Sequence, residues 1–229
     1  MRDEAPKKPI RSRRERPAKA ALSLEAIVRT ATDLLSRHGL EGLSLRKVAI
    51  ELDTGAASLY VYVESLEELH GLVLEHVLGS VEFPKPSKVP WDKRIIAYLE
   101  TYFQVLCAVP GIAQIAMMTM STGPNAMRLT ENLLELLDAG GVPETSAAWA
   151  VDQLLLHVTA VAAEQTNWRF RDNVVERSQM AYRQASPEQY PHIHKLGEKM
   201  FSGSKDRFRW SIQIILAGIR STPTPTSPN

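Results

Sequence analysis

A very short helical run between two longer ones limits what the first third of the chain can form. In ELDTGAASLYVYVESLEEL, residues 51–69, a helical pattern ends at Leu52 and is broken by Asp53-Thr54-Gly55. The next run lasts about two turns, and Ser65 then opens another helix as a capping box, in which we expect Glu68 to reach back to Ser65. Two helices joined by a tight turn, between longer helices, are typical of a helix-turn-helix unit.

Helical periodicity continues along the rest of the chain. Apolar residues recur at spacings of three and four, and no stretch shows sustained alternation of apolar and polar residues. Ser23 and Ser44 are candidate N-caps, and Gly39 follows a last helical turn. The prediction is therefore an all-α protein. Its helices should cover residues 24–38, 45–52, the short run, 66–81, 91–108, 111–120, 125–139, 144–170, 172–184, 188–201 and 205–220.

Proline clusters and charge divide the chain into five parts. EFPKPSKVP, residues 82–90, holds three prolines and predicts a linker. It separates a helix-turn-helix domain, 22–81, from a larger helical domain, 91–220. Residues 1–21 are expected to be a disordered basic arm and residues 221–229 a disordered tail.

The charge is concentrated in the arm. The net charge of the chain is +1, whereas residues 1–20 hold eight Lys or Arg and three acidic residues, so the remainder is slightly acidic. A basic arm before an acidic body suits DNA binding. A passive, solubilising tail remains the alternative.

Cysteine content and hydropathy bear on the compartment. Cys107 is the single cysteine, so no internal disulfide can form, and the basic N-terminus is not followed by an apolar signal segment. The most apolar run, residues 154–163, is half the length of a membrane crossing. We expect a cytoplasmic protein with no membrane partner.

The second helix of a helix-turn-helix enters the major groove, so its outer residues meet bases and phosphates. Leu59 should point to the core, which leaves the remaining side chains outward or at the edge. Alanine can contact a thymine methyl group, and tyrosine hydroxyls are suitable phosphate ligands. For the tyrosines, packing against neighbouring helices is the alternative. The predicted DNA contacts of this run are Ala56, Ala57, Ser58, Tyr60 and Tyr62.

Residues 22–81 resemble the DNA-binding domain of the TetR family of bacterial transcription regulators. The resemblance is carried by HGLEGLS at 38–44, LRKVA at 45–49 and SLYVYV at 58–63. It implies three helices of a helix-turn-helix domain, joined by a fourth helix to a ligand-binding and dimerisation domain. It also places Ser44 at the DNA and Arg46 where it reads a base, and arginine suits a guanine edge.

Two departures from the family pattern make the arm more important for DNA binding. Asp53 stands where the family's tight turn usually carries glycine, and Glu64 and Leu66 stand where its fourth helix usually opens with lysines. These changes remove phosphate contacts at that end. The arm should therefore supply minor-groove or backbone ligands, for which the candidates are Arg11, Arg13, Arg14 and Arg16.

The two helices at 144–170 and 205–220 are apolar on more than one face. Such helices must be covered on both sides. One cover can be the subunit's own core and the other a second copy of the chain; a fully internal helix in a monomer is the alternative. YPHI at 190–193 and DRFRWSIQIILAGIR at 206–220 resemble the tail of tetracycline-repressor-type domains. That resemblance implies a homodimer with a four-helix bundle across a two-fold axis.

A small-molecule pocket is suggested by methionines before a helix break, since methionine is common at permissive ligand surfaces. Plain core packing is the alternative for each residue. Tetracycline-binding members place a histidine before the Gly-Pro break for a magnesium-bound drug, where this chain has Thr119. We therefore expect no metal and no cofactor, although Glu164 is a candidate match for their acidic residue. The predicted apolar lining is Phe103, Cys107, Met117, Met120, Trp149 and Trp168, with Gln153, His157 and Glu164 as polar points.

Enzyme chemistry has little support in the sequence. His192 and His194 lie on different sides of a helix without a clear third ligand, and Cys107 has no evident base. The sequence instead predicts a sequence-specific DNA-binding regulator, a repressor released from its operator by a small, largely apolar ligand. The alternative is a helical ligand-binding or adaptor protein that does not act on DNA.

Overall fold

The protein is built from helices throughout the part of the chain that the structure describes. This computed structural model describes residues 22–85, 87–168, 174–222 and 224, and it confirms the all-α prediction. The elements are α1 (Leu24–His38), a 3-10 turn η2 (Leu40–Gly42), α2 (Leu45–Glu51), α3 (Ala56–Leu59), α4 (Leu66–Leu78), α5 (Trp91–Ala108), α6 (Ile112–Met118), α7 (Pro124–Ala139), α8 (Glu144–Trp168), α9 (Val174–Arg183), α10 (Pro191–Met200) and α11 (Ser204–Ser221).

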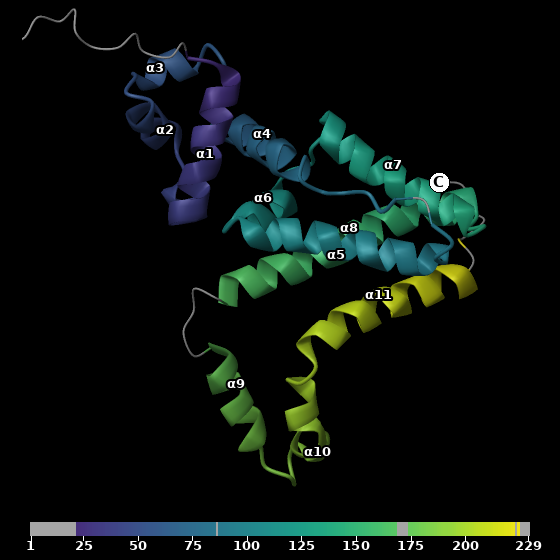
Figure 1. Cartoon of the computed structure of the whole chain (residues 1–229). Helices are drawn as coiled ribbons and strands as arrows, with labels where there is room; N and C mark the ends of the chain where they lie inside the picture. Colours follow the sequence, from purple (N-terminus) through teal and green to yellow (C-terminus); the bar gives the residue numbers. More distant parts are fainter. Residues whose placement is uncertain (1–21, 86, 169–173, 223, 225–229) are drawn as a thin grey trace, which may run out of the picture.

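The helices form a small end unit and a larger body (Figure 1). Helices α1, α2 and α3 gather at one end, and α4 runs from them into the body formed by α5 to α8 and α11. Helices α9 and α10 pack against each other as a hairpin that projects from the body. The arm and the C-terminal tail lie outside the described residues, so their predicted disorder stays a prediction.

Local capping signals set the boundaries of the first helices. The Ser23 hydroxyl accepts a hydrogen bond from the Ala26 amide at 3.1 Å, as the N-cap of α1. Gly39 ends α1 with φ 65° and ψ −171°, a backbone region that glycine alone adopts readily. Its amide donates to the Leu35 carbonyl at 2.8 Å, which satisfies one of the last carbonyls of the helix.

Three expectations for the helix-turn-helix segment were wrong in detail. Helix α3 has four residues, so Tyr60 is its C-cap and Tyr62 lies in the turn that follows. At the start of α4, the Ser65 hydroxyl accepts from the Glu68 amide as expected. The Glu68 carboxylate, however, accepts from the Glu64 amide rather than from the Ser65 amide. Helix α4 ends at Leu78, before Gly79, instead of continuing to residue 81.

Helix α8 is the centre of the body and packs against α5, α6, α7 and α11. Leu154, Val158 and Ala162 are fully buried on it. Tyr102 of α5 and Thr159 of α8 share a buried hydrogen bond of 2.8 Å between their hydroxyls. Burial raises the pKa of Tyr102, so its hydroxyl stays neutral in this contact.

Helix α8 is also long and apolar enough to cross a membrane over residues 144–166, which corrects the ten-residue estimate from the sequence. Helices α5 and α6 pass the same test as a pair bent by 110°. In this fold, however, α8 packs against four other helices of the body along one side. Its buried side, with Leu154, Val158 and Ala162, is therefore part of the core of the body.

Helix α6 brings the body into contact with the end unit. Gly111, its N-cap, has φ 88°, which favours glycine. A Cβ there would lie 2.9 Å from Leu35 Cδ1 of α1 and 3.0 Å from the Leu40 nitrogen of η2. The missing side chain therefore allows the start of α6 to sit directly on α1 and η2.

Candidate DNA-binding surface and ligand site

The first part of the candidate DNA surface is the N-terminal turn of α2. The Ser44 hydroxyl accepts from the Lys47 amide at 3.3 Å, so its own proton remains available to a phosphate oxygen. Arg46 follows in the first turn and is exposed. Arg37 of α1 pairs with Glu51 of α2 at 3.1 Å, an exposed contact between the two helices. Arg46 is thus carried by a short, capped helix held to α1.

The tight turn before α3 keeps its geometry without glycine. Asp53 adopts φ 49°, the left-handed conformation that aspartate tolerates better than most residues. Helix α3 then presents Ala57 and Ser58 to solvent, whereas Ala56 is half-buried and Leu59 is fully buried. The core therefore holds α3 by Leu59 and leaves its first turn accessible.

The two tyrosines differ in availability. Tyr60 is 57% exposed, while Tyr62 is 38% exposed and donates its hydroxyl proton to the Leu22 carbonyl at 2.8 Å. Tyr62 must give up this bond before it can donate to a phosphate. Val61, which the sequence analysis did not single out, is 81% exposed between them. An exposed valine at this place can contact a thymine methyl group.

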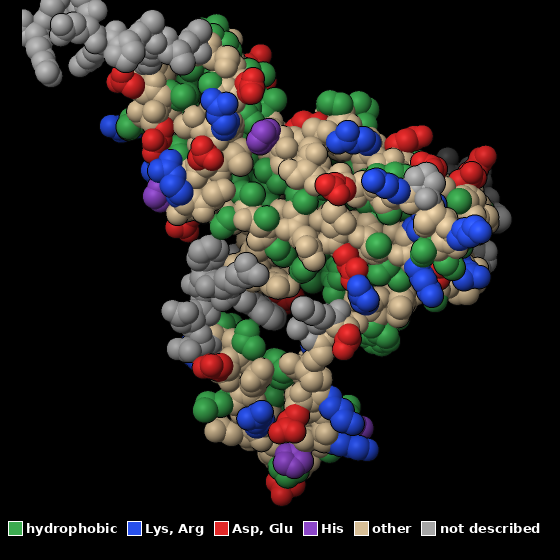
Figure 2. All heavy atoms as spheres, viewed as in Figure 1, with side chains coloured by type: hydrophobic (Ala, Val, Ile, Leu, Met, Phe, Trp, Pro, Cys, Tyr) green, Lys and Arg blue, Asp and Glu red, His purple; other side chains and the backbone are tan. Residues whose placement is uncertain are grey.

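Charges on this end of the molecule are mixed. Figure 2 shows Lys, Arg, Asp and Glu side chains interspersed over the visible face, without a uniformly basic surface. The four arginines of the arm lie outside the described residues. Their predicted role as phosphate or minor-groove ligands stays a prediction, and these arginines would add positive charge to a surface of mixed charge.

Two predicted ligand residues, Phe103 of α5 and His157 of α8, each contact α11. The rings of Phe103 and Phe208 lie 4.5 Å apart, and His157 Nε2 lies 2.6 Å from Ser211 Oγ. Ser211 donates its own proton to the Phe208 carbonyl at 2.8 Å, so Nε2 is the nitrogen that carries the imidazole proton. Burial lowers the pKa of His157 and favours this neutral form.

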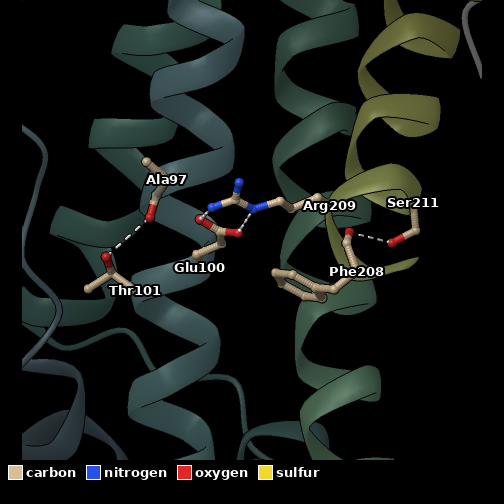
Figure 3. A network of polar contacts seen from close by, with 6 residues as sticks. All are labelled: Ala97, Glu100, Thr101, Phe208, Arg209 and Ser211. Carbon is tan, nitrogen blue, oxygen red and sulfur yellow. Dashed lines mark hydrogen bonds and ion pairs between the residues drawn. The ribbon is translucent and has the colours of Figure 1, made fainter. Parts of the chain in front are cut away.

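An ion pair between α11 and α5 lies beside these contacts. Figure 3 shows Arg209 of α11 and Glu100 of α5 joined by two hydrogen bonds, next to the Phe208 ring. Two parallel bonds between a guanidinium and a carboxylate fix the relative orientation of the groups. Helix α11 is therefore tied to α5 by two aromatic rings, tilted at 36° to each other, and by a charged pair.

The remaining predicted ligand residues do not converge on these contacts. Trp149 and Gln153 instead line a surface groove of about 230 Å³ near the start of α8 and the end of α11, together with Ile219 and Thr222. Met117, Met120 and Glu164 are exposed, Met120 to 92%, and Cys107 is half-buried one turn after Phe103. The side chain of Trp168 lies outside the described part.

Buried polar atoms that the sequence analysis missed lie on α4 and α6. Among the described residues, His70 Nε2 and Gln114 Oε1 are buried without a hydrogen-bond partner. Burial lowers the pKa of His70, against a smaller opposing effect of Glu67. Gln114 Nε2 donates to Thr166 Oγ1 of α8 at 3.4 Å. Such orphaned atoms usually meet a water or a ligand group, but only the fold reveals which atoms are buried.

The structure offers little for a metal. Within the described ranges, no group of three or more His, Cys, Asp or Glu side chains could hold a metal ion. Thr119, where tetracycline-binding members carry histidine, is half-buried just after α6.

Comparison with known proteins identifies the family. Residues 83–222 match the family described as "Tetracyclin repressor-like, C-terminal domain". An HTH-type transcriptional regulator of Saccharopolyspora erythraea is 31% identical over 216 residues, 93% of this chain and 91% of the relative. The HTH-type transcriptional repressor DrrR1 of Streptomyces coeruleorubidus is 29% identical over 223 residues, 90% of this chain and 80% of the relative.

Solved structures agree with these matches. The TetR family protein ActR of Streptomyces coelicolor, in complex with actinorhodin, has a TM-score of 0.81 at 32% identity, covering 88% of this chain and 98% of ActR. The resemblance found in the N-terminal residues and the helical architecture of both parts therefore lead to one conclusion. This chain belongs to the TetR family and is a helix-turn-helix transcriptional regulator.

Proposed function

We propose that the protein is a dimeric repressor that binds a near-palindromic operator in the cytoplasm and releases it when a small, largely apolar molecule binds. The observation that carries the DNA-binding part is the shared surface of α2 and α3. There Arg46, Ser58 and Tyr60 are exposed while Leu59 is buried beneath them. The arm arginines would add sequence-independent attraction to the phosphates.

The dimer is supported by an apolar surface on the outer sides of α8 and α11, through residues 144–170 and 205–220. Leu156, Trp210 and Ile214 are exposed there, although α8 and α11 pack against each other on their inner sides. A second copy of the chain would cover this surface. Two recognition units related by a two-fold axis then need half-sites about one helical turn apart, roughly 34–36 Å.

Selection from random duplexes tests the DNA-binding proposal. We expect the full chain to enrich a symmetric motif, and Arg46→Ala to lose preference at one base pair per half-site, at a cost of about 1–3 kcal/mol for each bidentate contact. Arg46→Lys is the matched variant, because lysine keeps the charge but not the two-pronged geometry. It should lose the base preference and keep the salt dependence. An output without a symmetric motif would favour a helical adaptor that does not act on DNA.

For the effector, the buried and unpaired atoms of His70 on α4 and Gln114 on α6 support polar anchor points on two helices that pack against each other. The neutral His70 imidazole and the Gln114 carbonyl can each orient an otherwise apolar molecule. Gln153 and Glu164, expected in this role from the sequence, are exposed instead. ActR has been crystallised with actinorhodin, so actinorhodin is a natural first compound to test here.

We expect at least one apolar aromatic compound, from a panel with actinorhodin and tetracycline, to release the operator equally with and without EDTA. Gln114→Leu should raise the concentration for half-release about fivefold, as for the loss of a hydrogen bond worth about 1 kcal/mol. Its operator affinity should not change. Gln153→Leu is the matched variant in the α8–α11 groove and should respond as the wild type. Release that needs a divalent cation, or a response lost in Gln153→Leu alone, would contradict this placement.

A further inference from the structure

The last turn of α4 is bonded to the first turn of α7 by one carboxylate. Glu75 Oε1 accepts from the Asn125 amide at 2.5 Å, and Oε2 accepts from the Ala126 amide at 3.2 Å and from the Ser121 hydroxyl at 3.3 Å. The Asn125 side-chain amide in turn donates to the Glu75 carbonyl at 2.9 Å. The Glu75 side chain of α4 thus acts as an N-cap for α7, which begins about fifty residues later in the sequence.

The contact is sterically close as well as polar. A Cβ at Gly123 would overlap the Glu75 carboxyl group, and a Cβ at Gly79 would lie 3.3 Å from Asn125 Nδ2. Arg128 Nη2 donates to Asn125 Oδ1 at 2.8 Å, which orients the amide so that its nitrogen faces Glu75. Two glycines and an oriented amide therefore hold the carboxylate in one place. Its negative charge also lies at the positive end of the α7 dipole.

The geometry links the DNA-binding unit to the regulatory body at both ends of α6. At its start, Gly111 sits against Leu35 of α1. Beyond its end, residues 119–123 lead directly to the Glu75 contact, through Ser121. Helix α4 packs on α1, so the angle of α4 sets the orientation of the whole unit. A shift of α6 must therefore be accommodated by Leu35 at one end and by Glu75 at the other.

We infer that Glu75 is the positioning residue that couples the regulatory body to the DNA-binding unit. Its carboxylate, capped onto α7, fixes α4 at the angle that suits the operator. A molecule that displaces α6 acts on DNA binding by pulling residues 119–123 away from it. This inference rests on the proposed function. It adds the residue through which the two sites communicate.

The coupling can be tested with operator DNA alone, because linkage between two sites is reciprocal. We would measure backbone hydrogen exchange of the full-length protein with and without a duplex obtained by selection. In the wild type, the operator should slow exchange in residues 44–62 and also in residues 119–126. In Glu75→Gln, protection of 44–62 should remain, protection of 119–126 should be lost, and operator affinity should fall about tenfold, a usual size for such coupling. The salt dependence should not change.

Matched variants separate coupling from folding. Glu131→Gln makes the same substitution at an exposed position of α7 and should behave as the wild type. Asn125→Ala removes the bond to the Glu75 carbonyl and leaves the carboxylate, so a smaller loss in the same direction is expected. If Glu75→Gln does not fold, Asn125→Ala tests the coupling in its place.

The outcomes distinguish this inference from the proposed function. Operator-induced protection of residues 119–126 that is the same in Glu75→Gln and the wild type, or that is absent from a wild type that binds its operator, would overturn the coupling alone. A wild type that binds no duplex would overturn the DNA-binding proposal together with it.

Discussion

Ile214→Asp should convert the protein into a monomer that no longer binds its operator at working concentrations. Ile214 is 49% exposed on α11, beside Trp210 on the surface that we assign to the second subunit. An aspartate there would be buried without a partner, which costs about 3–5 kcal/mol at an interface of this kind. A single subunit then reaches one half-site only, so operator affinity should fall by at least about a hundredfold.

Sedimentation velocity at micromolar concentration measures the first effect and a gel-shift titration the second. Met127→Asp is the matched control, because Met127 is an exposed apolar residue on α7, which is not one of the two helices of the proposed interface. It should remain a dimer. A wild-type protein that sediments as a monomer, or an Ile214→Asp protein that remains a dimer, would refute the proposed interface.

Leu59→Ala should abolish operator binding while leaving the dimer intact. Leu59 is fully buried and is the residue of α3 that reaches the core. Removing a buried leucine side chain typically costs about 2–5 kcal/mol, and α3 has only four residues and no side-chain N-cap to offset the loss. The recognition helix should therefore lose its fixed position, whereas α8 and α11 are unaffected.

The same two assays measure this variant, with circular dichroism to follow the loss of helix. Val61→Ala is its matched control, because Val61 is 81% exposed two residues away. Val61→Ala should keep the stability of the wild type and change DNA affinity only through the contact it loses. Full operator binding by Leu59→Ala would show that α3 is held by other residues than we propose.

The elements that could be predicted from the sequence are those set by local interactions. The serines at positions 23, 44 and 65 each cap a helix through an amide three residues later, and Gly39 ends α1 by its own backbone conformation. Such signals need only neighbouring residues, so the starts of α1, α2 and α4 and the end of α1 were predicted correctly. The family resemblance is confirmed as well. The exact extent of α3 was not predicted correctly, because a buried Leu59 is equally compatible with one helical turn or two.

The ligand residues could not be predicted in the same way. Trp149 is apolar and lies on an apolar helix, yet it is exposed near the start of α8. Helical periodicity does not distinguish a face that packs in the core from an apolar face that is exposed. Glu75 was missed since its partners, Ser121 and Asn125, lie about fifty residues away in the sequence. Contacts between helices depend on how the helices are rotated and offset, which no local pattern encodes.

The division of α3 between one buried anchor and several exposed residues has an evolutionary consequence. Because Leu59 ties this helix to the core, substitutions at Ala57, Ser58 or Val61 alter what the protein presents to DNA without removing core packing. Surface changes of this kind usually shift the free energy of unfolding by less than about 0.5 kcal/mol. A lineage can therefore acquire a new operator through single substitutions that selection for stability does not oppose, while the regulatory half continues to respond to the same molecule.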